Sequence, residues 1–193
     1  MPRTRAFEPE AAVERAMGLF WLQGYSETSV DELVGETGAS RYGLYSTFRG
    51  KHELFLRALE RYGRHVFGPT IARLEAPDAS LRDIQGFFQA IRARLRQPDG
   101  RRGCLMCNTA VELGPFDPPA ARRVRKHFRR IRAGFEHALK HARQGGELRR
   151  GVDVAASADY LLGVAQGAFV LARAGTGIAA IERFLDTALQ QLA

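Results

Sequence analysis

The chain has 193 residues, of which 45% are hydrophobic, and its formal net charge is +8 at pH 7. This length and composition are sufficient for one large or two small folded domains. We recognise no apolar run of membrane-spanning length and no secretory signal, so we expect no membrane partner and a cytoplasmic location. Two cysteines in a chain of this size do not suggest a disulfide framework.

The positive charge is spread unevenly along the sequence. Residues 1–65 hold nine basic and nine acidic side chains, whereas residues 66–152 hold eighteen basic and eight acidic ones. We interpret the basic run at 122–132 as the solvated face of a long helix. Such an excess can add a long-range attraction to DNA, but it lies outside the segment that we assign to DNA below.

The first predicted element is a helix over residues 9–23, because Val13, Met17 and Phe20 recur on one stripe before Gly24. Two short helices joined by a glycine turn follow within residues 28–51. Thr28 or Ser29 serves as the N-cap of the first of them, with two carboxylates in its first turn. Gly38 suits the position after its last turn, where the backbone adopts a positive φ.

The second short helix is predicted over residues 41–47, with Ser40 as its N-cap. Leu44 and Phe48 are four residues apart and face inward together. The outward side chains supply hydroxyls for phosphate oxygens, an arginine for guanine, and a glycine that permits close approach of the backbone; they are Ser40, Arg41, Tyr42, Gly43, Tyr45, Ser46 and Thr47. This face predicts a helix that lies in a DNA groove. The alternative is a small helical core with a solvated face.

Lys51 opens the next helix, where its ammonium group and the free backbone N–H groups can hold a phosphate together. Several spaced positions over residues 7–60 resemble the N-terminal domain of TetR-type transcriptional regulators. The matching residues are Gly24-Tyr25, Thr28-Ser29-Val30, Gly38-Ala39-Ser40, Leu44-Tyr45, Phe48 and Lys51.

The resemblance implies roles for individual residues of this helix-turn-helix. In the family, positions that match Thr28, Tyr45 and Lys51 contact phosphates. Those that match Ser40, Arg41, Tyr42 and Ser46 face bases or the nearby backbone. Relatives often carry a second aromatic residue and a histidine where this chain has Ser46-Thr47. We therefore expect the phosphate contacts at that end to be weaker or differently placed.

Beyond residue 65, proline and glycine separate five further helical stretches, and no segment alternates as a strand does. The stretches are 80–97, 103–113, 119–144, 153–174 and 178–192. The sequence therefore predicts an all-α fold with two domains. A three-helix DNA-binding domain occupies residues 1–65, and a larger helical effector-binding and dimerisation domain occupies residues 66–193.

Residues 153–174 are apolar on almost every side and contain Gly163 and Gly167, which permit close helix approach. A helix with two apolar faces needs two partners, and we expect the second to be another subunit. The resemblance places residues 119–144 and 153–174 in a four-helix dimer bundle. Such a homodimer would read the two half-sites of a palindromic operator, about 34–36 Å or a multiple apart. A monomeric bundle is the alternative.

The resemblance also implies a small-molecule pocket whose occupancy changes the separation of the two DNA-reading heads, so that a repressor leaves its operator. The candidates are aromatic and aliphatic side chains with a few polar groups among them. They are Phe87, Phe88, Ile91, Asn108, Glu112, Phe116, Phe135, Gln166 and Phe169. Ordinary core or surface placement is the alternative for each of them.

Cys104 and Cys107 form a Cys-x-x-Cys motif after two arginines, at the predicted start of a helix. Positive charge and a helix N-terminus both favour the thiolate. Gly103-Cys104-Leu105 resembles a segment through which some TetR-type regulators sense electrophiles or oxidants, and this carries over to Cys104 alone. The alternatives are buried structural thiols and a thiol-based redox enzyme. The enzyme lacks support from any βαβ pattern or other catalytic motif, and we predict no metal, cofactor or catalytic residue.

Overall fold

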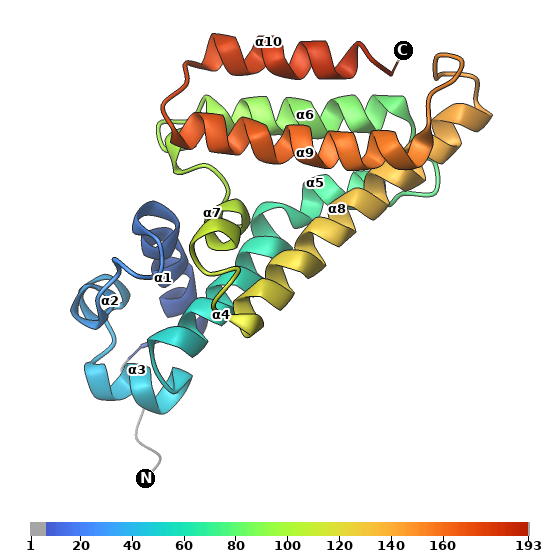
Figure 1. The fold of residues 1–193 in the computed structure, drawn as a ribbon. Helices are drawn as coiled ribbons and strands as arrows, with labels where there is room; N and C mark the ends of the chain where they lie inside the picture. Colours follow the sequence, from blue (N-terminus) through green and yellow to red (C-terminus); the bar gives the residue numbers. More distant parts are fainter. Residues whose placement is uncertain (1–6, 193) are drawn as a thin grey trace.

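A computed structural model describes residues 7–192 of the chain, and this part is built from helices without a strand (Figure 1). The all-α prediction is therefore confirmed. The helices are α1 (Pro9–Gln23), α2 (Val30–Thr37), α3 (Arg41–Phe48), α4 (Lys51–Arg61), η1 (Tyr62–Val66), α5 (Gly68–Leu74), α6 (Leu81–Leu95), η2 (Gly100–Arg102), α7 (Leu105–Glu112), α8 (Pro118–Gln144), α9 (Val154–Arg173) and α10 (Ile178–Leu189).

Helices α1 to α3 form a small unit at one end of the molecule, which we call the head. Its elements begin and end where the local signals predict. Ser29 caps α2 and forms a capping box with Glu32, the Ser29 hydroxyl accepting from the Glu32 N–H at 3.1 Å. Gly38 ends α2 with φ 70°, a conformation that a residue with a Cβ adopts only at a cost.

The remaining helices form a larger unit, the body, into which α4, η1 and α5 run as one rod (Figure 1). Helix α8 lies along this rod, and α10 covers α6 and α9. The rod is interrupted at η1, where the Phe67 N–H donates to the Tyr62 carbonyl in an i to i+5 bond of 3.4 Å. Pro69 follows at the start of α5 and cannot donate to a preceding carbonyl. The predicted boundary after residue 65 falls inside η1, within the rod and not between two separate helices.

Aromatic side chains fill the centre of the body. Phe88 and Phe135 stack with their ring centroids 5.8 Å apart, and Phe87 packs edge-on against both. Phe169 of α9 packs edge-on against Phe67 at 5.5 Å. Burial of these rings supplies much of the hydrophobic stabilisation of the body.

Helix α9 is long and apolar enough to cross a membrane by length and composition, so the expectation that no such run exists is wrong. Core helices of globular proteins pass the same test. Here α9 packs against α6, α8 and α10 within the described fold, which is why its sequence is apolar on several sides.

Candidate nucleic-acid interface

Helix α3 lies at the free end of the head, on the side away from the body (Figure 1). Leu44 and Phe48 are buried and anchor it, as their four-residue spacing predicts. Tyr42 is 80% exposed and Tyr45 is 48% exposed, although large aromatic side chains are usually covered. The helix thus offers solvent a polar and aromatic face backed by an apolar anchor.

Hydrogen bonds within the head hold the polar groups of this face. The Ser40 hydroxyl accepts from the Gly43 N–H at 3.0 Å, and the Ser46 hydroxyl donates to the Gly43 carbonyl at 3.2 Å. Arg41 pairs with Asp31 of α2 at 2.5 Å, and both side chains are exposed. An exposed pair of this kind contributes little stability. The Arg41 guanidinium can therefore exchange Asp31 for another acceptor at low cost.

Gly43 also makes a close contact within the head, beside the predicted approach of its backbone to DNA. A Cβ at this position would lie 3.0 Å from Cε1 of Phe7 and 3.2 Å from the Ser40 hydroxyl oxygen. The Phe7 ring in turn packs against Phe48, with centroids 6.3 Å apart. The glycine accommodates the segment that precedes α1, a contact between residues far apart in sequence.

Thr28 is fully buried, which contradicts the expected contact of its hydroxyl with phosphate. Its hydroxyl donates to the Gly24 carbonyl at 2.6 Å and closes the turn between α1 and α2. Burial of a hydroxyl without a partner costs free energy, and this bond satisfies it. We therefore omit Thr28 from the DNA-contacting residues proposed below.

Lys51 begins α4 and lies beside the turn after α1. Its Nζ donates to the Ser26 carbonyl at 3.4 Å and lies 4.4 Å from the centroid of the Tyr25 ring. Partial burial lowers the pKa of Lys51, while Glu112 and Glu32 oppose this shift. These contacts hold the ammonium group at the start of α4, where backbone N–H groups are unpaired by the helix.

Arg49 is a basic residue of the head that the sequence analysis missed. It is exposed, lies between α3 and α4, and has φ 62°. Among the described residues it is the non-glycine residue with a positive φ. That conformation costs on the order of 1 kcal/mol. The sequence signal was an arginine directly before Gly50, in a turn two residues from Lys51.

The head is tied to the body by hydrogen bonds that reach α7 and its flanking turns. The Glu112 carboxylate accepts from the Tyr25 N–H at 3.0 Å and from the Ser26 N–H at 2.7 Å. Trp21 Nε1 donates to the Gly103 carbonyl at 3.1 Å. Since these bonds span the two units, the position of α7 constrains the position of the head.

Comparisons with known proteins agree with this arrangement. Residues 12–58 match the family model described as bacterial regulatory proteins, tetR family, and residues 80–188 match the model described as tetracyclin repressor-like, C-terminal domain. The second match covers more than half of the chain. The chain belongs to the TetR family of bacterial regulatory proteins.

Individual relatives of this TetR-family regulator cover most of its length. It is 33% identical over 162 residues to the uncharacterized HTH-type transcriptional regulator YezE of Bacillus subtilis, covering 83% of this chain and 84% of YezE. It is 29% identical to the HTH-type transcriptional repressor ComR of Escherichia coli, and the match covers 97% of this chain and 90% of ComR. Its fold matches that of a cysteine mutant of CifR complexed with 26-bp double-strand operator DNA, with a TM-score of 0.85 and 24% identity. This match covers 97% of the present chain and 98% of the CifR chain.

As a TetR-family member, the protein is a DNA-binding transcriptional regulator and not an enzyme. This membership excludes the alternative interpretation of the Cys-x-x-Cys motif as part of a thiol-based redox enzyme. The matched N-terminal model spans most of the head together with the first part of α4, and the matched C-terminal domain spans the helices from α6 to α10.

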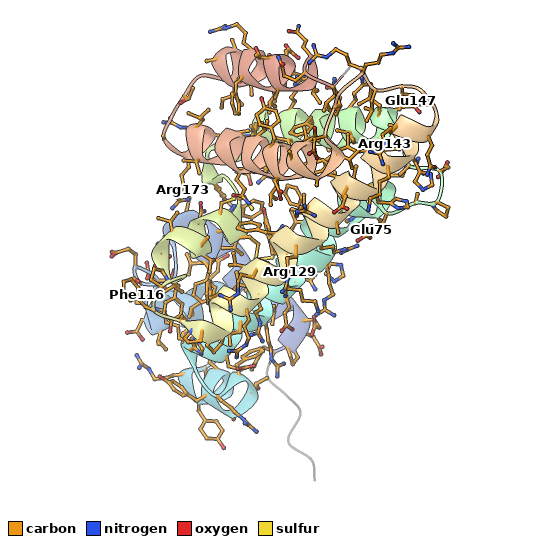
Figure 2. All side chains as sticks on the ribbon, turned by 45° about the vertical axis from the view of Figure 1, so that its right-hand side comes forward. Glu75, Phe116, Arg129, Arg143, Glu147 and Arg173 are labelled. Atoms are coloured by element: carbon orange, nitrogen blue, oxygen red, sulfur yellow. The ribbon has the colours of Figure 1, made fainter. Side chains whose placement is uncertain are left out.

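The residues predicted to line an effector pocket do not converge in this TetR-family fold. Phe87, Phe88, Ile91, Phe135 and Phe169 are core residues with at most 3% exposure. Glu112 belongs to the contact between head and body, and Asn108 donates to the Arg102 carbonyl at 3.0 Å. Phe116 is 81% exposed and projects from the turn after α7 (Figure 2). Helical periodicity could not separate these surroundings, because it places a residue on a face without saying what covers that face.

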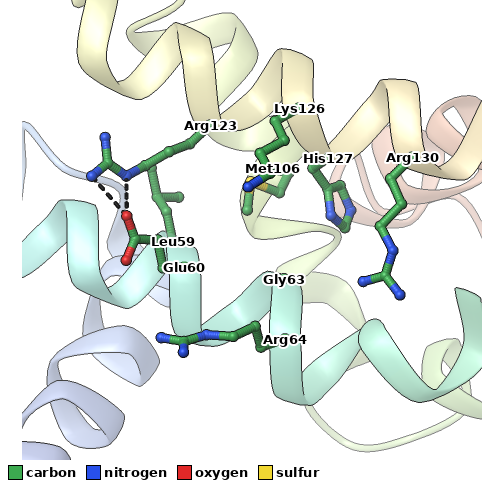
Figure 3. Close-up of a pocket in the computed structure, with 9 residues that line it drawn as sticks. All are labelled: Leu59, Glu60, Gly63, Arg64, Met106, Arg123, Lys126, His127 and Arg130. Carbon is green, nitrogen blue, oxygen red and sulfur yellow. Dashed lines mark hydrogen bonds and ion pairs between the residues drawn. The ribbon is translucent and has the colours of Figure 1, made fainter. Parts of the chain in front are cut away.

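Gln166 is the candidate that does border a cavity, together with Phe87 and Phe169. That cavity has a volume of about 10 Å³, roughly the space for one water molecule. A hollow of about 460 Å³ lies elsewhere, between the α4–η1 rod and α8 (Figure 3). None of the nine predicted pocket residues lines it.

Cys104 and Cys107 are both buried, and neither forms a disulfide. Burial raises the pKa of Cys104, but hydrogen bonding from the Cys107 thiol and the first N–H groups of α7 outweighs it and sets this pKa to about 7. The same bond to Cys104, together with burial, raises the pKa of Cys107. The Tyr62 hydroxyl points toward this pair, is fully buried, and forms no well-aligned hydrogen bond within the described residues. The two neighbouring thiols therefore have pKa values shifted in opposite directions.

Proposed function

We propose that the protein is a homodimeric, cytoplasmic repressor that occupies a palindromic operator and is released by a small-molecule effector. The observation that carries this proposal is the exposed polar face of α3, held by buried Leu44 and Phe48 at the free end of the head. Relatives of similar length named as transcriptional repressors, ComR and DhaR among them, support the sign of regulation.

The proposed subunit interface uses α9 and α10. Tyr160 and Val170 of α9 and Phe184 of α10 are exposed apolar side chains. Gly167 lies between them, with its Cβ position 3.5 Å from the Phe184 ring. A second copy is the occupant that this surface suits, because a twofold axis places the same face of two α9 helices together.

Helix α8, which we expected to pair alongside α9, has the wrong surface for that role. Its apolar stripe is buried against the rod, α6, α7 and α9. The exposed side chains of α8 are mainly basic, and Arg129 lies on its outer face (Figure 2). We therefore replace α8 by α10 in the proposed four-helix interface.

The proposed DNA contacts divide into two groups. Ser40, Arg41, Tyr42 and Ser46 face base edges or the nearby backbone, with Gly43 among them on α3. Tyr45, Lys51 and Arg49 contact phosphates. Two observations support this division. The proposed contact residues other than Gly43 and Lys51 have exposed side chains, and Lys51 lies at the start of α4.

The two groups respond differently to substitution. Once selection from random duplexes supplies an operator, Lys51→Ala is expected to weaken binding about tenfold on every duplex and to reduce the salt slope by about 1. Arg41→Ala should cost about 1–3 kcal/mol on the operator and relax the preference at one base pair. Arg125→Ala, an exposed change on α8, is the control. Wild-type affinity and selectivity in both the Lys51→Ala and the Arg41→Ala proteins would disprove the assignment.

A second candidate is regulation by oxidation of the thiols, favoured by the position of Cys104 at the start of α7, three residues before Cys107, and by the pKa of Cys104 of about 7. With hydrogen peroxide, the Cys104 thiolate attacks one oxygen, the O–O bond breaks, and hydroxide leaves. The Cys107 thiol then attacks the sulfur of the sulfenic acid, and water leaves as the disulfide forms.

The thiol mechanism predicts that micromolar peroxide lowers operator affinity of the wild type at least tenfold at pH 7.5, and that dithiothreitol restores it. Cys104→Ser should bind the operator equally with and without peroxide. Electrophoretic mobility shifts measure both proteins side by side. Peroxide sensitivity that survives in Cys104→Ser, or that is missing in the wild type, would eliminate this candidate.

A further inference from the structure

The hollow between the rod and α8 is the largest one described above, and its lining differs from that of the body's core. Leu59, Gly63 and Met106 form its apolar part. Most other lining groups are basic side chains from both walls, with Arg64 on η1 and Lys126 and Arg130 on α8 (Figure 3). A volume of about 460 Å³ lies within the range of small-molecule sites.

The carboxylates near the hollow are already paired. Glu60 accepts from Arg123 at 2.8 Å, and Glu75 accepts from Arg130 in a two-point contact at 2.7 Å. Within residues 7–192, no carboxylate pairs with Arg64 or Lys126. The hollow therefore holds two basic groups whose charge is not matched by a protein anion, on opposite walls.

His127 contributes a neutral polar group. It is buried on α8, and this burial, together with the charge of Arg130, lowers its pKa to about 4. At neutral pH its ring therefore adds a hydrogen-bonding group without adding a charge. A Cβ at Gly63 would lie 3.5 Å from Met106 Cε and 3.6 Å from His127 Nδ1. The missing side chain at residue 63 thus leaves the floor of the hollow open.

We propose that this hollow is the effector site and that it takes a small organic anion. A carboxylate head binds between Lys126 and Arg64, and a flat apolar body rests over Gly63, beneath which the buried side chains of Leu59 and Met106 close the hollow. This inference rests on the proposed function, since it names the chemistry of the effector that releases the repressor. The site is distinct from the small cavity beside Phe87 and Phe169 in the aromatic core.

The location of the hollow allows a ligand bound there to affect the DNA-reading helix α3 from a distance. One wall is the rod that continues from Lys51, and the other is α8 of the body. A bound anion attracts Arg64 toward Lys126 and so biases the position of the rod against the body. Because the rod leads into the head, the ligand and the operator favour different positions of it. By reciprocity, each lowers the affinity of the other by the same factor.

The test uses 2-naphthoate as the anion and 2-naphthamide as its uncharged counterpart. Calorimetric titration of the DNA-free protein in about 0.15 M salt should show naphthoate binding and at least tenfold weaker amide binding. Lys126→Gln and Arg64→Gln should each weaken naphthoate about tenfold. Gly63→Leu, which fills the floor, should abolish binding of both compounds. Arg129→Gln removes a charge from the outer face of α8 and should leave the titration unchanged.

Operator binding is measured separately, with and without naphthoate at a saturating concentration. We expect naphthoate to lower operator affinity of the wild type and of Arg129→Gln, to have a smaller effect on Lys126→Gln at the same concentration, and to have none on Gly63→Leu. Thermal unfolding and operator binding without ligand confirm that each variant is folded. No naphthoate binding, equal binding of the amide, unchanged titrations in both charge variants, or binding without an effect on the operator would overturn the proposal. Failure of the ligand-free protein to bind any duplex would instead refute the proposed function.

Discussion

Replacing Val170 by arginine is expected to convert the protein into monomers and to lower its operator affinity at least 100-fold. Val170 is 52% exposed on α9, within the apolar surface that includes Tyr160 and Phe184. A guanidinium there would lose its hydration when two copies meet, with no carboxylate opposite to pair with it. Operator affinity falls because two linked heads bind DNA more tightly than one head by a factor on the order of 10² to 10⁴.

Sedimentation equilibrium and operator titrations measure the two consequences independently. Val111→Arg is the matched control, because Val111 is 80% exposed on α7, outside the α9–α10 surface. The control should remain dimeric and keep its operator affinity. A dimeric Val170→Arg protein would show that the subunits meet elsewhere.

Removing the Glu112 carboxylate is expected to loosen the head from the body. Glu112→Ala loses both charge-assisted hydrogen bonds to the turn after α1, and we expect the free energy of unfolding to fall by about 1–3 kcal/mol. Gly24 has φ 96°, and its Cβ position lies 2.9 Å from Oε2 of Glu112, so this turn is shaped around the carboxylate. Urea unfolding measures the change, and Glu27→Ala, an exposed carboxylate on the same turn, is the control.

The contribution of Glu112 depends on pH in a defined direction. Burial raises the pKa of Glu112, but the N–H groups of Ser26 and Tyr25 outweigh burial and lower it below its ordinary value. A carboxyl with a lowered pKa in the folded state stabilises the fold above its unfolded pKa and loses this effect as the pH falls through the folded value. The difference in stability between wild type and Glu112→Ala should therefore shrink between pH 5 and pH 3. An equal difference at all pH values would contradict a role for the charge.

Local signals predicted the head well because they act within a few residues. The Ser29 and Ser40 caps, the turn at Gly38 and the inward spacing of Leu44 and Phe48 each depend on near neighbours. Local signals did not predict the surroundings of residues whose contacts lie far away in the sequence. Thr28 is buried by the turn after α1, Gly43 lies against the Phe7 ring, and Glu112 bonds to residues 86 and 87 positions away.

The hollow proposed as the effector site could not be predicted for a related reason. Its walls come from the rod, α7 and α8, and their basic residues have the same spacing as a solvated helix face. Arg125 and Lys126 are neighbours in sequence, yet Lys126 lines the hollow while Arg125 does not. The choice between α8 and α10 for the subunit interface also depends on which apolar stripe remains uncovered after the body has folded.

The rod from α4 through η1 to α5 has a consequence for how this chain can vary among species. Each residue of a helix turns the chain by roughly 100°. Inserting or deleting one residue between Gly50 and Gly68 would therefore rotate α3 about the axis of the rod. The two heads of the proposed dimer would then no longer face the same side of a DNA duplex. Homologues should therefore preserve the length of this span while its exposed residues diverge.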